Sequence, residues 1–114
     1  MKIKNKIFKI FLKTFFKRIL SLEKENKINS ALDHIFDIIE DLCIDNKLNF
    51  IDNLFLDKRI DDLDINLQIG FLTITLPWKD SFKNRTFLYC KVYQKLYLKY
   101  NDIKKVELVL SKLK

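Results

Sequence analysis

The chain has 114 residues, of which 48% are apolar and 32% charged, with a single glycine and a single proline. This length and composition fit one globular domain, and they argue against intrinsic disorder and against an all-β fold with many tight turns. Lysine and arginine outnumber aspartate and glutamate by 22 to 15, so the formal net charge of +7 favours an anionic partner.

The charge is divided unevenly along the sequence. Residues 1–20 carry seven basic and no acidic side chains, whereas residues 21–66 carry five basic and twelve acidic ones. Residues 67–114 carry ten basic and three acidic side chains. An acidic middle between two basic ends predicts internal charge matching that leaves some basic surface for a partner.

The first predicted helix covers residues 2–20. At about 100° per residue, a regular series of lysines falls on one strip, and large apolar side chains occupy most of the remaining circumference. So wide an apolar arc requires a cover, which the rest of the chain, a partner protein or a membrane surface could supply. Two interpretations stay open: a core helix with one wet face, or a docking element. The lysine strip consists of Lys2, Lys6, Lys9, Lys13 and Lys17.

Residues 1–20 are thus expected to form a basic amphipathic N-terminal helix, packed as one unit with a helical domain over residues 21–114. No run of about 18 apolar residues occurs, which disfavours a transmembrane helix. Lys9 and Lys13 interrupt the hydrophobic stretch that a secretory signal needs, and no small-residue cleavage site follows. The sequence therefore predicts an intracellular, cytoplasmic protein.

A second helix is predicted over residues 28–44, after a polar connection at residues 21–27. Its acidic side chains Asp33, Asp37, Glu40 and Asp41 share one face, opposite an apolar face. This acidic face either pairs with the lysines of the first helix or faces solvent, since exposed pairs contribute only about 0–1 kcal/mol each. A turn at residues 45–49 and a short helix over residues 50–58 follow.

Residues 65–76 are the most ambiguous element, because their apolar pattern fits both helical and strand spacing. We expect a buried helix, since a lone strand among helices has nothing to pair with. Asp61 and Asp62 would supply its N-cap and first-turn charge, and Gly70 would mark a close crossing with another helix. The alternative is an α+β fold with a hairpin at residues 67–93.

A further helix is predicted over residues 82–99, capped by Asp80 or Ser81, and a final helix over residues 103–113. Tyrosines and lysines run in rows beside the core face of the first of these. Aromatic rings next to cations are typical of single-stranded nucleic-acid platforms and of protein interfaces. The alternative is that the tyrosines ring the core with their hydroxyls outward. The candidate contact face comprises Trp78, Lys79, Arg85, Tyr89, Lys91, Tyr93, Lys95 and Tyr97.

Nothing in the sequence favours catalysis. The only histidine, His34, has Asp37 and Asp41 nearby on its predicted helix, but a site with one histidine is a poor metal site. One glycine cannot build a phosphate-binding loop. Cys43 and Cys90 lack metal-ligand spacing and are expected to be free thiols. We therefore expect no enzyme, no metal and no cofactor.

These observations together predict a compact all-α bundle of four to six short helices. The predicted function is a small non-catalytic accessory protein that docks on a protein or nucleoprotein partner through basic surfaces. Direct nucleic-acid binding and peripheral membrane association through the first helix are the alternatives.

Overall fold

The computed structural model describes residues 2–45 and 47–114, and it describes side chains from Lys9 onward within those ranges. The all-α prediction is confirmed: the described residues form α-helices and short 3₁₀ segments, with no strand among them, so the hairpin alternative at residues 67–93 is wrong. The elements are α1 (Lys2–Lys24), α2 (Ile28–Ile44), α3 (Leu48–Leu54), α4 (Lys58–Asp61), α5 (Ile65–Ile74), the 3₁₀ segment η1 (Leu76–Ser81), α6 (Arg85–Tyr100), α7 (Ile103–Leu110) and the 3₁₀ segment η2 (Ser111–Leu113).

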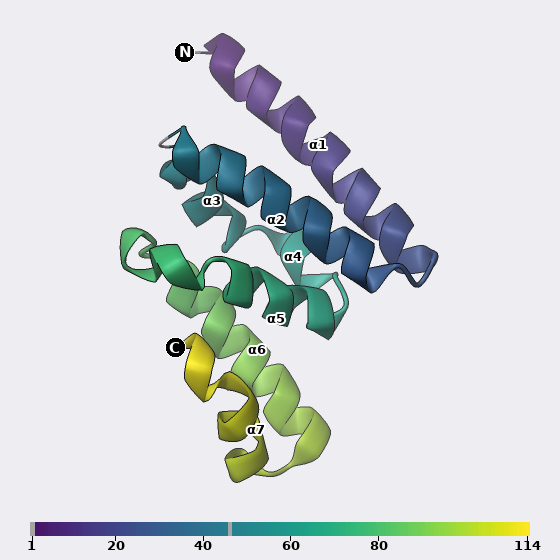
Figure 1. The fold of residues 1–114 in the computed structure, drawn as a ribbon, viewed down its shortest axis with the longest axis vertical. Coiled ribbons are helices and arrows are strands. Elements are labelled where there is room, and N and C mark those ends of the chain that lie inside the picture. Colours follow the sequence, from purple (N-terminus) through teal and green to yellow (C-terminus); the bar gives the residue numbers. More distant parts are fainter. Residues whose placement is uncertain (1, 46) are drawn as a thin grey trace.

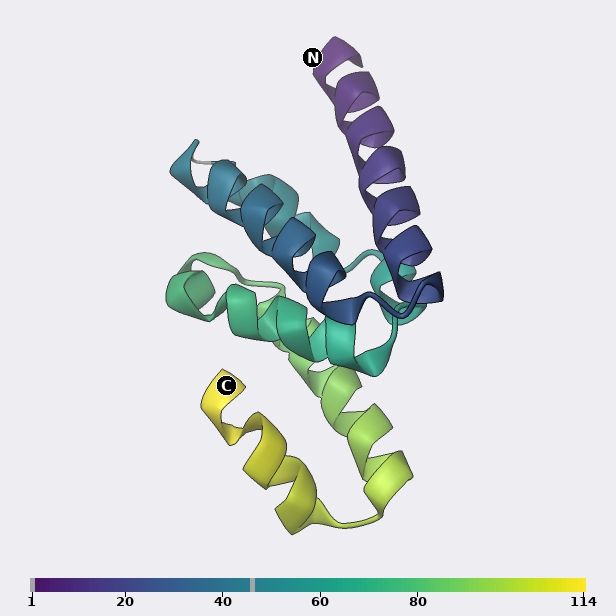
Figure 2. The same ribbon diagram turned by 45° about the vertical axis from the view of Figure 1, so that its right-hand side comes forward.

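Helices α2 and α5 lie in the middle of an elongated molecule of 47 × 34 × 21 Å. Helix α1 flanks α2 on one side, and α6 and α7 form the opposite end (Figure 1). The N-terminal half of α1 diverges from α2 and stands away from the other helices, which is clearest in the turned view (Figure 2). The molecule therefore has a packed body and one projecting helical arm.

The packing of α1 changes along its length. Its described side chains are exposed at Lys9 and Ile10, and the first buried one is Leu12. From there to its end the helix contributes a series of buried residues to the core, so its second half is part of the body. These residues are Leu12, Phe15, Phe16, Ile19 and Leu22.

Helix α1 is one turn longer than the sequence predicts, because Leu22 is buried and holds residues 21–24 in the helix. The helix ends at Lys24, and two residues later Asn26 is left-handed, with a φ of 59°. The backbone N–H of Lys27 donates to the carbonyl of Leu22, and that of Asn26 donates to the carbonyl of Glu23. This is the Schellman arrangement, in which asparagine takes the place of the usual glycine.

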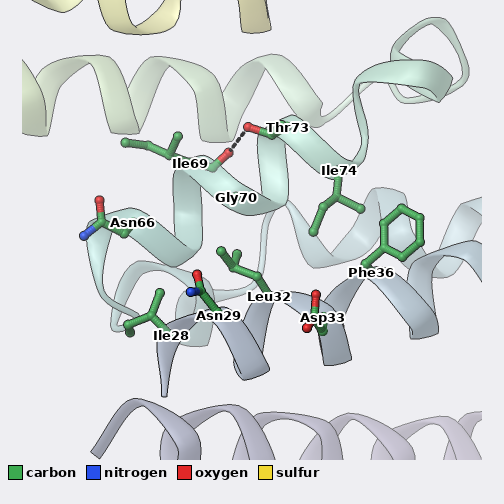
Figure 3. Close-up of a pocket in the computed structure, with 10 residues that line it drawn as sticks. All are labelled: Ile28, Asn29, Leu32, Asp33, Phe36, Asn66, Ile69, Gly70, Thr73 and Ile74. Carbon is green, nitrogen blue, oxygen red and sulfur yellow. Dashed lines mark hydrogen bonds between the residues drawn. The ribbon is translucent and has the colours of Figure 1, made fainter. Parts of the chain in front are cut away.

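The segment 65–76 is helical, as predicted, although the α-helix ends at Ile74 and Leu76 begins η1; Gly70 lies where α5 crosses α2. A Cβ atom added to Gly70 would overlap the Cδ2 atom of Leu32 on α2. Figure 3 shows Leu32 pointing toward Gly70 across this crossing. The predicted role of the glycine is confirmed: without a side chain, it lets the two helices approach.

The predicted helix caps are wrong in two places. Asp64, and not Asp61 or Asp62, caps α5, by accepting a hydrogen bond from the backbone N–H of Asn66. Residues 76–81 form η1, so α6 begins only at Arg85 and neither Asp80 nor Ser81 caps it. The buried carboxylate of Asp52 on α3 accepts from the backbone N–H of Asn84 instead, at 2.9 Å. At the start of α6 a tertiary contact thus replaces the predicted local cap, whereas α5 keeps a local cap at a different residue.

The other boundaries differ less from the prediction. The region 50–58 divides into two short helices, α3 and α4, because Asp57 is extended and caps α4 by accepting from the backbone N–H of Arg59. The break between α6 and α7 occurs as predicted. Asn101 is left-handed with a φ of 50°, and Asp102 accepts from the backbone N–H groups of Lys104 and Lys105.

Candidate docking surface on helix α1

The lysine strip is exposed where its side chains are described. Lys9, Lys13 and Lys17 are all exposed, and no ion pair joins any of them to a described acidic residue. The side chains of Lys2 and Lys6 lie outside the described residues. Because the described lysines are four residues apart, they lie one above another on a single face of the helix. The body of the protein therefore leaves this positive face without a countercharge.

The acidic face of α2 does not neutralise that strip. Asp33, Asp37 and Asp41 are exposed, and among the described side chains no ion pair links α2 to α1. The two helices instead meet through apolar and aromatic contacts, such as the stacking of Phe15 on His34 with ring centroids 6.0 Å apart. Of the two interpretations left open by the sequence, the described residues support a solvated acidic face.

Apolar side chains lie next to the lysines on the exposed surface of α1. Ile10 is 63% exposed, and Leu20 is 38% exposed. Phe16, by contrast, is buried, with the guanidinium carbon of Arg59 located 4.4 Å from its ring centroid. The wide apolar arc predicted from the sequence is therefore covered only in part, and its uncovered part adjoins the basic strip.

The candidate contact face predicted from the sequence, called here the second candidate surface, includes two lysines on α6, and both have hydrogen-bond or ion-pair partners within the protein. The Nζ atom of Lys91 lies 2.6 Å from a carboxylate oxygen of Asp61. The Nζ atom of Lys95 lies 3.1 Å from the side-chain oxygen of Gln68 and 3.9 Å from Asp61. Gln68 is itself buried and donates to the carbonyl of Leu63. These lysines fasten α6 to α4 and α5.

Arg85 was predicted to lie on the contact face, but its side chain is buried in the interior. Its Nη2 atom donates to the carbonyl oxygen of Leu72 at 2.6 Å, and its Nε atom donates to the hydroxyl of Thr75 at 3.1 Å. Burial lowers the pKa of the Arg85 guanidinium. Arg85 thus supplies hydrogen-bond donors to a carbonyl and a hydroxyl at the C-terminal end of α5, and its side chain does not reach the surface.

The aromatic residues of this second surface are divided between core and solvent. Tyr89 donates from its hydroxyl to the carbonyl of Leu110 at 3.4 Å, and burial raises its pKa. Trp78 and Tyr93 are half-buried against the core. Tyr97 is 38% exposed, and exposed Lys79 reaches the carbonyl of Lys114. The eight predicted contact residues therefore do not form one continuous basic and aromatic face.

The described residues contain no group of three or more metal-ligating side chains. His34 stacks on Phe15 of α1. Cys43 is half-buried and Cys90 exposed, both as free thiols, and desolvation raises the pKa of Cys43. No helix in the described part of the chain is both long and apolar enough to cross a membrane.

Sequence analysis missed a groove between α2 and α5, whose walls include Leu32, Phe36 and Ile74 (Figure 3). Phe36 is a large apolar side chain on α2, yet it is 42% exposed at this groove. The groove depends on the distance at which two helices cross, which no local pattern encodes. The one available signal was Gly70, which marked the crossing itself.

Comparison with known proteins adds no further information: the chain matches no protein-family model, no curated protein and no solved structure.

Proposed function

We propose that this protein is a non-catalytic accessory protein that docks on a protein or nucleoprotein partner through the lysine strip of α1. The observation that supports this proposal is the contrast between its two sets of basic residues. Lys91 and Lys95 have acceptors within the protein, as does Arg85. The described lysines of α1 have no ion-pair partner in the part of the chain that the structure describes.

The geometry of the strip suits an extended acidic surface. Steps of four residues correspond to a rise of about 6 Å along the helix, so Lys9, Lys13 and Lys17 span about 12 Å. A row of like charges steers an oppositely charged partner and fixes its register more than it adds affinity. The exposed side chain of Ile10 supplies adjoining apolar area, and a combination of apolar centre and polar rim is typical of protein interfaces.

The test is capture of a partner from the native cell by the tagged full-length chain. The wild type is compared with a variant in which Lys2, Lys6, Lys9, Lys13 and Lys17 are replaced by Gln. A matched control replaces five exposed lysines elsewhere, so that the net charge changes equally. The control positions are Lys83, Lys99, Lys104, Lys112 and Lys114.

We expect the wild type and the control to capture the same protein, and the strip variant to lose it. The captured protein is then purified and bound again in isolation. Retention of every partner by the strip variant would contradict the proposal.

Two further conditions distinguish the alternatives. Loss of the partner after nuclease treatment, with affinity that falls steeply with salt, would indicate direct nucleic-acid binding. Binding of the wild type, but not of the strip variant, to anionic lipid vesicles would indicate membrane association instead.

A further inference from the structure

The groove between α2 and α5 has a volume of about 610 Å³ and is mostly apolar. Leu32 and the closely approaching Gly70 form its floor, and Phe36 and Ile74 extend from opposite helices at one end (Figure 3). An aromatic side chain that is 42% exposed in such a groove is the kind of feature that marks an interaction site. The lining residues are Ile28, Asn29, Leu32, Asp33, Phe36, Asn66, Ile69, Gly70, Thr73 and Ile74.

The two helices that form the groove carry only negative charge. Helix α5 has no charged residue, and α2 has four acidic residues and neither lysine nor arginine. Asp33 lines the groove directly and is exposed. Glu40 follows Phe36 by four residues on α2 and so continues the acidic rim along the same side. The complementary ligand is an apolar helix that carries cations and no acids.

This chain contains such a helix. Residues 1–20 carry seven basic and no acidic side chains. In the sequence, Ile3, Ile7 and Ile10 have the i, i+4, i+7 spacing with which an amphipathic helix places its anchors in a groove. Of these, Ile10 has a described side chain, which is 63% exposed.

The arm cannot enter the groove of its own molecule. Helix α1 is continuous from Lys2 to Lys24 and packs on the His34 side of α2 through its second half. Its first half continues straight, away from α5 (Figures 1 and 2). The nine helical residues before Phe11, which itself packs against the core, extend about 14 Å at 1.5 Å per residue. Turning the arm back toward α5 would require breaking the helix.

We propose that the groove between α2 and α5 receives the N-terminal arm of α1 from a second copy of this chain. Two copies that exchange arms form the same contact twice, as the symmetry of a closed dimer requires. The apolar residues of the arm enter the groove, and the acidic rim attracts its flanking lysines. This inference does not depend on the identity of an external partner.

Sedimentation velocity of the full-length chain over a concentration series tests the proposal. The groove variant is Asp33→Lys, and its matched control is Asp41→Lys, which makes the same charge change on the same helix outside the groove. The arm variant replaces Ile3, Ile7 and Ile10 by Asp. Circular dichroism of each variant verifies that it is folded.

We expect the wild type to dimerise and Asp33→Lys to weaken dimerisation by about tenfold or more. Asp41→Lys should behave as wild type. A mixture of the arm variant and the groove variant should associate more strongly than either variant alone but more weakly than wild type, because one of the two arm-groove contacts is intact in the mixed pair.

A wild type that stays monomeric at every concentration would overturn the proposal. It would also be overturned by a groove variant with wild-type dimerisation, or by a mixture that associates no more strongly than either variant alone.

Discussion

Replacement of Arg85 by Ala should destabilise the fold, because this side chain is buried and holds the end of α5 to the start of α6. Its guanidinium donates to the carbonyl of Leu72 and to the hydroxyl of Thr75. A hydrogen bond that involves a charged group contributes about 1.5–3 kcal/mol. Part of this is offset by the cost of burying the charge, which also lowers the pKa of Arg85. The expected net loss in the free energy of unfolding is about 2–4 kcal/mol.

Urea denaturation followed by circular dichroism measures this loss. Arg85→Lys should fall between wild type and Arg85→Ala, since one ammonium group cannot reproduce the two-point geometry of the guanidinium. Lys83→Ala, at an exposed neighbouring position, is the control and should stay within about 0.5 kcal/mol of wild type. If Arg85→Ala also stayed within that range, the two hydrogen bonds of the Arg85 guanidinium would make no net contribution to stability, which would contradict this prediction.

Three further predictions concern the packing and charge of the body. Gly70→Ala should lower the melting temperature of the wild type, because the new Cβ meets Leu32. In a Leu32→Ala background the same substitution should raise the melting temperature, because the higher helix propensity of alanine, worth up to about 1 kcal/mol, then dominates. A change of the same sign in both backgrounds would refute this. Arg59 lowers the pKa of Asp57 through a side-chain hydrogen bond, so the contribution of this pair to folding stability is fully present above about pH 4 and is lost as pH falls through the folded-state pKa of Asp57. The stability of Asp57→Asn should therefore fall less steeply on acidification than that of wild type, and an identical pH dependence below about pH 4 would contradict this. Reversing Asp33, Asp37 and Asp41 to Lys should leave the monomer's melting temperature unchanged at low and high salt, whereas a loss confined to low salt would reveal pairing with α1.

The helical elements were predictable because they depend on local periodicity. Leu88, Val92 and Leu96 on α6 follow i, i+4 spacing, and all three are buried. The assignment of residues 65–74 as helix succeeded for a different reason: without a second strand nearby, a strand had no hydrogen-bonding partner. Gly70 could be interpreted from the sequence because a lone glycine inside a helix usually has a packing role.

The hydrogen bond at the start of α6 and the interior partners of the predicted contact face were not predictable, since they depend on residues distant in the sequence. Asp52 serves the start of α6, 32 positions away, and Asp61 holds Lys91, 30 positions away. A row of lysines on a helical wheel does not show which of them have a buried acceptor. Helical spacing alone therefore marks lysine rows on both α1 and α6, whereas the structure distinguishes them.

The sequence also posed a choice for α1 between core helix and docking element, and its two halves differ in this respect. Leu12 and the buried residues after it belong to the core, whereas Ile10 faces solvent. Deletion of residues 1–20 would remove both functions at once. A shorter truncation separates them.

Removal of residues 2–9 from the otherwise complete chain, followed by thermal unfolding and partner capture on the same preparation, is the most direct test of the account. No side chain in the described core is removed by this truncation, because the buried residues of α1 begin at Leu12. We predict a melting temperature close to that of wild type together with loss of the partner. An unfolded truncated chain, or one that is folded and still binds its partner, would contradict the account.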